Sequence, residues 1–394
     1  MKNIYLVELK KIFSQKKTYI IWGVFIILLL LNLHTNMVQS YHPISNTIDE
    51  KWLSGAKHDL ERINEVLNNK DISPDEKKNY KKYLAMKQEE INNINIVLDK
   101  NISDMEKVKA KMNIIKIMMV EKDDGKLVDP YDIQAYKNEY AYLQYLYDNK
   151  IPENNNQNYF YYIFNFFDSY TMLIFVIIIG LISSDSISKE IEESTIKLML
   201  IQPVSRLKII TGKYLALITA ITAIILSTLT FAFIIVGLLY GIGNPAYPFI
   251  SGMQYDLSKN INPLMTQLAG FSGVYIPAWL MLVRTFIFFI LFSIAIASLG
   301  FLISKISNST SISNSIIVII NICLIYIVFA TKMLEKFTSY IYISYFNIFK
   351  LFSSQIKLIL NNNNITPISG VIVMIGMSLF SFFVTLVLFK RRDV

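Results

Sequence analysis

The apolar residues of this sequence gather into long runs instead of alternating with polar residues. Each run has roughly 20 residues or more, enough for a helix to cross a hydrocarbon core of about 30 Å. Backbone groups in lipid must find partners within their own segment, and unbroken apolar runs favour helices over a barrel. The pattern therefore predicts an all-α polytopic membrane protein with six transmembrane helices, at residues 18–35, 161–183, 209–240, 276–303, 312–331 and 367–389.

A large polar insertion, residues 36–160, lies between the first two runs. Within it, apolar residues recur with a spacing near 3.5 in four successive stretches, and Lys87 is a polar break in the second. Turn and break signals at Pro74 and Pro130 separate some of these stretches. The insertion is therefore predicted to be a coiled-coil-like helical domain, either a hairpin or a small bundle.

Basic residues flank the apolar runs on one side only, which predicts the orientation of the chain. Cytoplasmic loops of membrane proteins carry an excess of Lys and Arg, so both termini are expected in the cytoplasm. The cytoplasmic segments are then an interfacial amphipathic helix at 1–17, a helical loop at 184–208, a turn at 304–311 and a tail at 390–394. The extracellular segments are the helical insertion at 36–160, a loop at 241–275 and an amphipathic segment at 332–366.

Composition agrees with this arrangement. The chain has 394 residues, of which 53% are hydrophobic, and its mean hydropathy is +0.40. The net charge is +8, yet the insertion holds 18 Lys and Arg against 21 Asp and Glu, so the surplus lies beside the apolar runs. Membrane lipids account for that surplus, and no nucleic-acid partner is needed. The one cysteine, Cys323, lies in an apolar run, so no disulfide framework or cysteine metal site is expected.

A charged stretch at 186–213 lies between the second and third runs. Its first part has helical spacing, and the less charged face is formed by Ile187, Ile191, Thr195 and Leu198. Pro203 breaks this helix, and Ser205 is placed to cap the next one. Such a segment at the membrane surface suits docking to a second protein, but an ordinary cytoplasmic loop with a solvated face fits the spacing equally well.

Two charged residues lie inside the apolar runs. Asp168 lies in the second run, and Arg284 lies at a similar depth in the fourth. Charged residues within spans often mark a substrate path or an ion pair. An ion pair or polar pocket near the outer leaflet is one interpretation of Asp168 and Arg284. Snorkelling of both side chains to the outer interface is the simpler one.

The sequence carries no catalytic or metal-binding motif. It lacks the GxxxxGK[ST] phosphate loop, the HExxH pattern and the GxSxG pattern. Its three histidines, His34, His42 and His58, gather near the outer end of the first run, where nothing completes a ligand spacing. An intramembrane enzyme would need ionisable residues deep in several runs. We therefore expect no enzyme activity, no metal and no cofactor in this chain.

Short motifs within 186–213 resemble the signature of type-2 ABC transporter permeases. They are Lys189-Glu190, Glu193-Ser194-Thr195, Lys197-Leu198, Pro203-Val204-Ser205-Arg206 and Gly212-Lys213, with Ser194 where that family usually has glycine. The Glu8-Leu9-Lys10-Lys11 segment before the first run is also similar to the family. So is the arrangement of six spans with a large insertion after the first.

The resemblance implies partners and a role. It implies a separate cytoplasmic ABC ATPase, which binds the ATP and Mg²⁺, and a second permease, either a copy or a paralogue. The loop at 184–208 would be the coupling element for that ATPase, acting through Lys189, Glu190, Glu193, Thr195, Lys197, Pro203 and Arg206. Like bacterial drug and peptide exporters, the protein would move an amphipathic substrate (a peptide antibiotic, a toxic peptide or a lipid-like drug) across the cell membrane. A non-transporting sensor or scaffold whose extracellular domain detects a ligand is the alternative.

Overall fold

A computed structural model describes residues 2–36, 48–69, 72–124, 130–153, 158–168, 171–196, 204–255, 257, 273–331 and 334–391. The chain divides into two compact units. The membrane unit combines Met1–Val38, Gln157–Gly243 and Trp279–Val394, and the insertion unit combines Gln39–Asn156 and Asn244–Ala278. The predicted insertion is therefore joined by a later segment of the chain, which the sequence predicts to be a separate outer loop.

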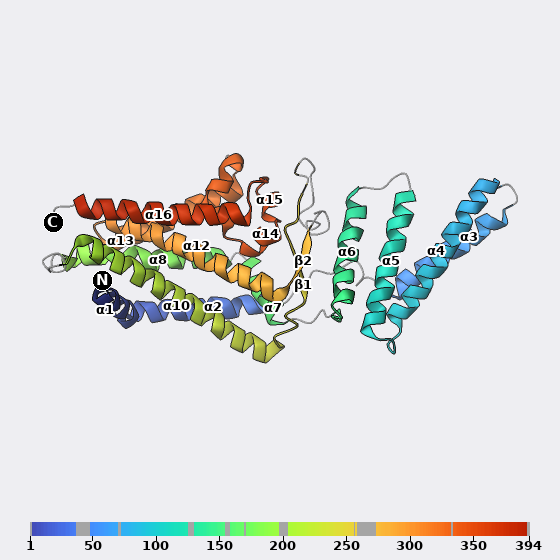
Figure 1. The fold of residues 1–394 in the computed structure, drawn as a ribbon, viewed down its shortest axis with the longest axis horizontal. Coiled ribbons are helices and arrows are strands. Elements are labelled where there is room, and N and C mark those ends of the chain that lie inside the picture. Colours follow the sequence, from blue (N-terminus) through green and yellow to red (C-terminus); the bar gives the residue numbers. More distant parts are fainter. Residues whose placement is uncertain are drawn as a thin grey trace. The chain divides into compact units, whose positions relative to one another are not determined.

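Long apolar helices form the membrane unit (Figure 1). Within the described residues, five spans are long and apolar enough to cross a membrane. They lie in α8 (Thr171–Glu192), α10 (Arg206–Tyr240), α12 (Ala278–Ile306), α13 (Thr310–Ile325) with the π turn η3 (Tyr326–Ala330), and α16 (Pro367–Arg391). A sixth span requires α1 (Lys2–Ser14) and α2 (Lys16–Asn36) together, and the chain bends by 64° between them. The predicted fold class, an all-α polytopic membrane protein, is confirmed.

The second span differs from its predicted extent of 161–183. This region forms two helices, α7 (Tyr159–Asp168) and α8, and α8 continues to Glu192. The serines near the end of α8 hydrogen-bond back to carbonyls of the same helix, as Ser186 does to Ser183 and Ser188 does to Ser184. Polar residues therefore extend this helix without leaving their hydroxyls unpaired. The first part of the loop predicted at 184–208 is the end of a spanning helix.

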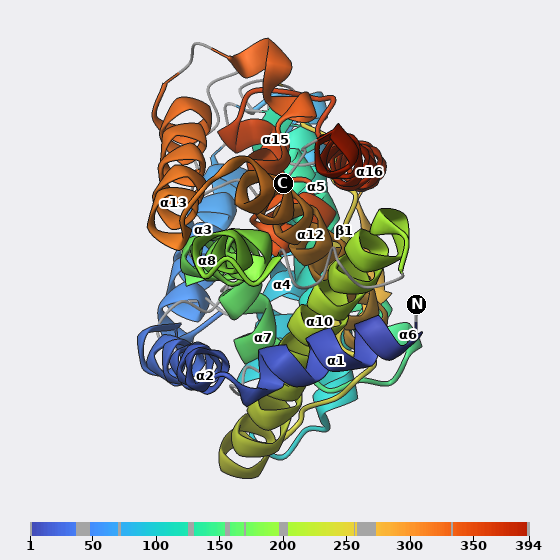
Figure 2. The ribbon, with the colours of Figure 1, turned by 90° about the vertical axis from the view of Figure 1, so that its left-hand side faces the viewer.

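Small and polar residues hold α8 against its neighbours. In Figures 1 and 2, α8 and α13 lie side by side, and α1 crosses the start of α10. Gly180 permits close approach of α13, because a Cβ atom there would meet Ile317 Cγ1 at 2.9 Å. Ser313 of α13 donates a hydrogen bond to the carbonyl of Ser184 (2.7 Å). Such contacts are typical of helices that pack against one another in lipid.

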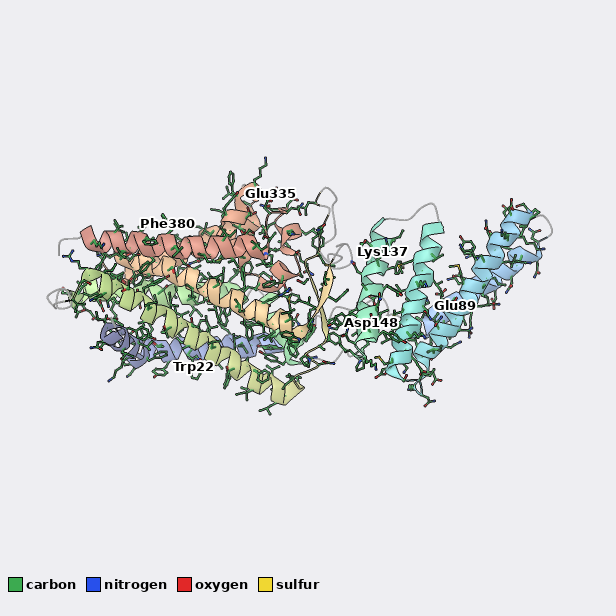
Figure 3. All side chains as sticks on the ribbon, viewed as in Figure 1. Trp22, Glu89, Lys137, Asp148, Glu335 and Phe380 are labelled. Atoms are coloured by element: carbon green, nitrogen blue, oxygen red, sulfur yellow. The ribbon has the colours of Figure 1, made fainter. Side chains whose placement is uncertain are left out.

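The segment at 334–366, which lies within the amphipathic segment predicted at 332–366, is built largely from short helices. It forms four short helices, η4 (Glu335–Tyr340), η5 (Tyr342–Tyr345), α14 (Ile348–Phe352) and α15 (Ile356–Ile359). Figure 3 marks Glu335 at its start and Phe380 on α16. The segment's apolar residues are largely buried, and the rings of Tyr345 and Phe352 meet Phe288 of α12. Its polar residues find internal partners: the Asn362 amide, for example, donates to the carbonyl of Glu335 (2.8 Å).

The four apolar stretches of the insertion correspond to four helices. These are α3 (Glu50–Asn68), α4 (Pro74–Leu98), α5 (Asp104–Asp124) and α6 (Pro130–Asp148), each packed against the next. Figure 3 marks Glu89 on α4 and Lys137 and Asp148 on α6. A capping box starts α4, because Ser73 and Glu76 bond each other's backbone N–H groups.

The helices of the insertion unit bury two small apolar clusters. One contains Ile48, Ala56, Ile94 and Ile114, and the other contains Val108, Ile115, Tyr142, Leu143, Leu146 and Ile151. The polar break at Lys87 has a partner, since its ammonium donates to buried Glu90 (2.6 Å). Glu90 also accepts a hydrogen bond from the indole of Trp52 (3.1 Å). Lys87 thus belongs to a polar contact between α3 and α4.

A short β-ribbon that the sequence analysis did not predict completes the insertion unit. Its strands β1 (Pro248–Ser251) and β2 (Val274–Pro277) are antiparallel. Tyrosines attach it to α6: the hydroxyls of Tyr142 and Tyr247 share a hydrogen bond, and that of Tyr275 donates to the carbonyl of Asn138 (3.1 Å). Burial raises the pKa of Tyr142 and raises that of Tyr247 to about 12. Both phenols are therefore neutral at physiological pH.

Candidate functional site

Four charged side chains from three helices form a cluster in the membrane unit, and all but Lys11 are buried. We call Glu8 and Lys11 of α1, Glu190 of α8 and Lys213 of α10 the ion cluster. Lys213 donates to Glu8 (2.7 Å) and to Glu190 (2.5 Å), and Lys11 donates to the same oxygen of Glu190 (2.6 Å). The cluster therefore joins three helices that are distant in sequence.

Burial makes this ion cluster energetically demanding. Glu190 and Lys213 are only 1% and 3% exposed, and Glu8 is 7% exposed. A buried charge is tolerated when it is paired, and the two carboxylates and two ammonium groups balance each other here. Removing one of the three buried partners would leave an uncompensated charge, which typically costs about 3–5 kcal/mol. The four residues therefore act as one unit.

The packing of α1 on α10 places the ion cluster. Gly212 precedes Lys213, and a Cβ atom at Gly212 would meet Ile4 Cγ2 of α1 at 2.9 Å. One turn further along α1, Glu8 then reaches Lys213. The hydroxyl of Tyr5 donates to Thr219 (3.3 Å) on the same side of α10. The Gly-Lys pair at the start of this span thus supplies both the close approach and the charge.

A second ion pair lies beside the cluster. Lys17, at the start of α2, pairs with Asp185 of α8 and also donates to the carbonyl of Leu181 (3.3 Å). Charged residues of both contacts line a small hollow of about 60 Å³, together with Lys189. That volume is far below the size of a drug-sized ligand site and suits a few water molecules. We take it as space in which these side chains can rearrange.

The position of Glu190 does not match the partner contact that was predicted for it. The family resemblance implies a contact between this residue and a partner protein, but its carboxylate faces inward and is held by two lysines. Glu193, three residues later, is exposed and remains available to a partner. Sequence reasoning missed the pairing of Lys17 with Asp185, although opposite charges at the same end of two predicted spans were a usable signal.

The other residues of the predicted coupling loop are spread over the end of α8 and the start of α10. Lys189 is half-buried, and Thr195 Oγ1 donates to the carbonyl of Glu190 (3.5 Å). Arg206 donates to the carbonyl of Lys390 (3.0 Å). Ser205 stands at the N-cap of α10, but its side chain makes no capping bond. Lys197 and Pro203 lie outside the described residues, as does Leu198.

Ser194 adopts a backbone conformation that favours glycine. Its φ is +57°, in the left-handed region, and it follows the last turn of α8. Helices commonly end with a glycine in this conformation, because a side chain there is strained. The glycine expected from the family resemblance at this position therefore has a local structural reason.

Asp168 and Arg284 are not brought together. Asp168 ends α7 and pairs with Lys350 of α14 (3.2 Å), while the amide of Asn347 donates to the Asp168 carbonyl (2.9 Å). Arg284 is exposed on α12. The ion pair considered for the outer end of the second span thus has a different cation, supplied by the segment at 334–366.

The described residues contain no group of three or more His, Cys, Asp or Glu side chains that could hold a metal ion. The exposed thiol of Cys323 and the exposed imidazole of His58 lie in different units. His34 and His42 lie among residues whose side chains are not described. The ion cluster is a set of ion pairs at a junction of three helices.

Comparison with known proteins assigns the chain to a family. The family model for ABC-2 family transporter proteins matches residues 2–394. A comparison with curated proteins found no match. Members of this family are the membrane components of ABC transporters and do not themselves hydrolyse ATP. The chain therefore belongs to the ABC-2 family of transporter proteins, as a multi-pass permease component that works with an ABC ATPase.

Proposed function

We propose that this permease exports an amphipathic substrate across a bacterial cell membrane, and that the ion cluster carries the ATPase's movement into the membrane unit. The observation that carries the proposal is the contact of buried Glu190 with both Lys213 and Lys11. Glu190 lies in the last turn of α8, three residues before the exposed Glu193 and close to the rest of the predicted coupling loop. A partner that displaces this end would act on the cluster directly.

The geometry of Glu190 supports such a role. One oxygen of its carboxylate accepts hydrogen bonds from Lys213 (2.5 Å) and from Lys11 (2.6 Å). The two lysines belong to α10 and α1, so a shift of α8 changes both links. Ionic contacts of this length lose much of their energy when charges separate by a few ångströms, because the interaction falls with distance. The end of α8 is thus coupled to two other helices at one atom.

The charges of the same region support an orientation. Lys17, Lys189 and the C-terminal Lys390-Arg391-Arg392 are basic residues beside the spanning segments, and we assign these ends of the spans to the cytoplasm. Both termini would then be cytoplasmic, and an ATPase would approach the loop at 184–208 from that side. A second permease, a copy or a paralogue, would complete the assembly.

The proposed substrate class rests on the character of the membrane unit. Aromatic rings gather around α7 and its neighbours, where Phe167 meets Phe286 and Phe289 and Phe164 meets Phe349. One charged pair, Asp168 with Lys350, lies beside them. Most of these rings are buried against one another, so the amphipathic substrate class rests on the resemblance to bacterial drug and peptide exporters and on the aromatic character of the spans.

Reconstitution into vesicles tests the proposal. The full-length permease and the ATPase that co-purifies with it are placed in proteoliposomes, and ATP with Mg²⁺ is added outside. We expect ATP-dependent uptake of a dye-labelled amphipathic peptide into vesicles whose permease exposes its cytoplasmic side. Stable ATPase binding without uptake of such a peptide would contradict the proposed export and favour a sensor or scaffold.

A further inference from the structure

The last residue of α8 makes a contact that the ion cluster does not include. Glu192 Oε2 accepts two hydrogen bonds from Thr310, one from its backbone N–H (2.9 Å) and one from its hydroxyl (2.7 Å). Thr310 is the first residue of α13. The carboxylate therefore satisfies a free N–H group at the start of that helix, where the helix dipole also favours a negative charge.

Glu190 and Glu192 are only two positions apart, yet they contact different helices. Glu190 is buried against α1 and α10, whereas Glu192 is exposed and bridges to α13. The end of α8 therefore contacts two sets of helices. The ion cluster links it to α1 and α10, and the Glu192–Thr310 bridge links it to α13.

Contacts of α13 continue beyond the Glu192–Thr310 bridge. α13 packs along α8, where the Ser313 hydroxyl donates to the Ser184 carbonyl (2.7 Å). Further along α13, buried Asn321 accepts a hydrogen bond from the hydroxyl of Tyr342 (2.7 Å), which belongs to η5. α13 thus connects the end of α8 with the short helices at 334–366.

We infer that Glu192 is a positioning residue that passes displacement of the α8 end to α13, separately from the ion cluster. The inference rests on the proposed function, because it requires the ATPase to move the end of α8. The inference requires α13 to respond, so its test observes α13 directly. Because the Glu192 carboxylate is exposed, its removal leaves the buried contacts of the membrane unit in place.

Cys323 supplies the reporter. It is the single cysteine of the sequence, it lies on α13, and it is exposed. A nitroxide attached to this native thiol reports the surroundings of α13 in the full permease–ATPase complex in lipid nanodiscs. In the wild-type complex we expect the spectrum to change when ATP and Mg²⁺ are added.

Two substitutions of Glu192 separate the bridge from the charge. Glu192→Ala removes the acceptor, and we expect ATPase binding to persist while the ATP-dependent spectral change falls about fivefold or more. Glu192→Gln keeps an oxygen that can accept both bonds from Thr310, so most of the change should return. Glu76→Ala is the matched control, because Glu76 accepts the same two kinds of bond from Ser73 at the start of α4 (3.1 and 2.8 Å).

Each alternative result overturns the inference. A full spectral change in Glu192→Ala, or none in the wild-type complex, would show that α13 does not respond through this residue. Loss of ATPase binding in Glu192→Ala would make Glu192 part of the docking surface. A Glu192→Gln variant as defective as Glu192→Ala would assign the effect to the negative charge of Glu192. That result would contradict a link made by the hydrogen bonds to Thr310. Failure of the wild-type permease to bind any ATPase would instead contradict the proposed function.

Discussion

Two regions of this protein join distant parts of the chain by polar contacts, and they use different chemistry. In the membrane unit, Lys213 meets Glu8 across 205 positions of sequence, and all four members of the ion cluster are charged. In the insertion unit, Tyr142 meets Tyr247 across 105 positions, and both groups are neutral phenols. Each contact fixes an element that local pattern alone would not place.

The difference concerns what each contact can do. The ion cluster has two donors on one oxygen of Glu190, so its pairs can exchange when a helix shifts. The tyrosine contact is supported by packed rings, with the ring of Tyr142 against those of Tyr247 and Tyr275. Such a contact favours a fixed arrangement of β1, β2 and α6. We therefore expect movement to pass through the first region and rigidity to characterise the second.

Neutralising Lys213 should produce the largest effect. Lys213→Met leaves Glu8 and Glu190 with one ammonium group between them, and breaking a buried pair in this way typically costs about 3–5 kcal/mol. Thermal unfolding of the purified permease in detergent measures the loss. Lys208→Met, on the exposed side of the same helix, is the control and should unfold close to the wild type. Equal unfolding temperatures for the two variants would contradict the structural role of the cluster.

Raising the pH should loosen the insertion unit. Burial raises the pKa of Tyr247 to about 12, while unfolded tyrosine titrates near 10. The folded unit binds the proton more tightly, so this stabilisation is complete below about pH 10 and is lost as the pH rises through about 12, a change of roughly 2–3 kcal/mol. Hydrogen exchange of the α6 amides measures it.

The control for the alkaline effect is Tyr247→Phe. This variant keeps the ring but removes the titrating hydroxyl, so the change between pH 10 and pH 12 should become smaller. Exchange of the α6 amides that depends on pH equally in both proteins would show that Tyr247 does not report the stability of this unit.

A small stabilisation is expected from Ser194→Gly. Ser194 has a φ of +57°, and glycine adopts this region without strain, so we expect a gain of about 0.5–1 kcal/mol. Ser205→Gly is the comparison, because Ser205 has a φ of −63° and its side chain makes no capping bond. It should bring no gain in unfolding temperature. If Ser194→Gly is no more stable than Ser205→Gly, the strain argument is wrong.

The sequence was sufficient for the features that depend on local pattern. Runs of apolar residues predict the spanning helices, and the 3.5-residue spacing predicts the helices of the insertion. The motif at 186–213 also carried the family resemblance, and its Gly212-Lys213 pair lies at the centre of the candidate site. In each case the information resides within one stretch of chain.

The features that sequence analysis missed depend on distant partners. Helical spacing places Glu190 on one face of its helix, but it cannot reveal that Lys213 and Lys11 contact that face. The strands β1 and β2 are only four residues long each, which is too short for an alternating pattern to stand out. The segment at 334–366 is amphipathic in sequence, but its pattern cannot reveal that polar groups such as the Asn362 amide bond within the segment.

The most direct test of the account is a double-mutant cycle on Glu190 and Lys213. ATP-driven uptake is measured for Glu190→Gln, Lys213→Gln and the double variant, each with its ATPase bound. If the pair acts as one coupling unit, each single variant should lose about tenfold, equivalent to about 1.4 kcal/mol, and the double variant should be no slower than the worse single. Losses that simply multiply, or single variants that transport normally, would contradict the claim that this cluster carries the ATPase's movement into the membrane unit.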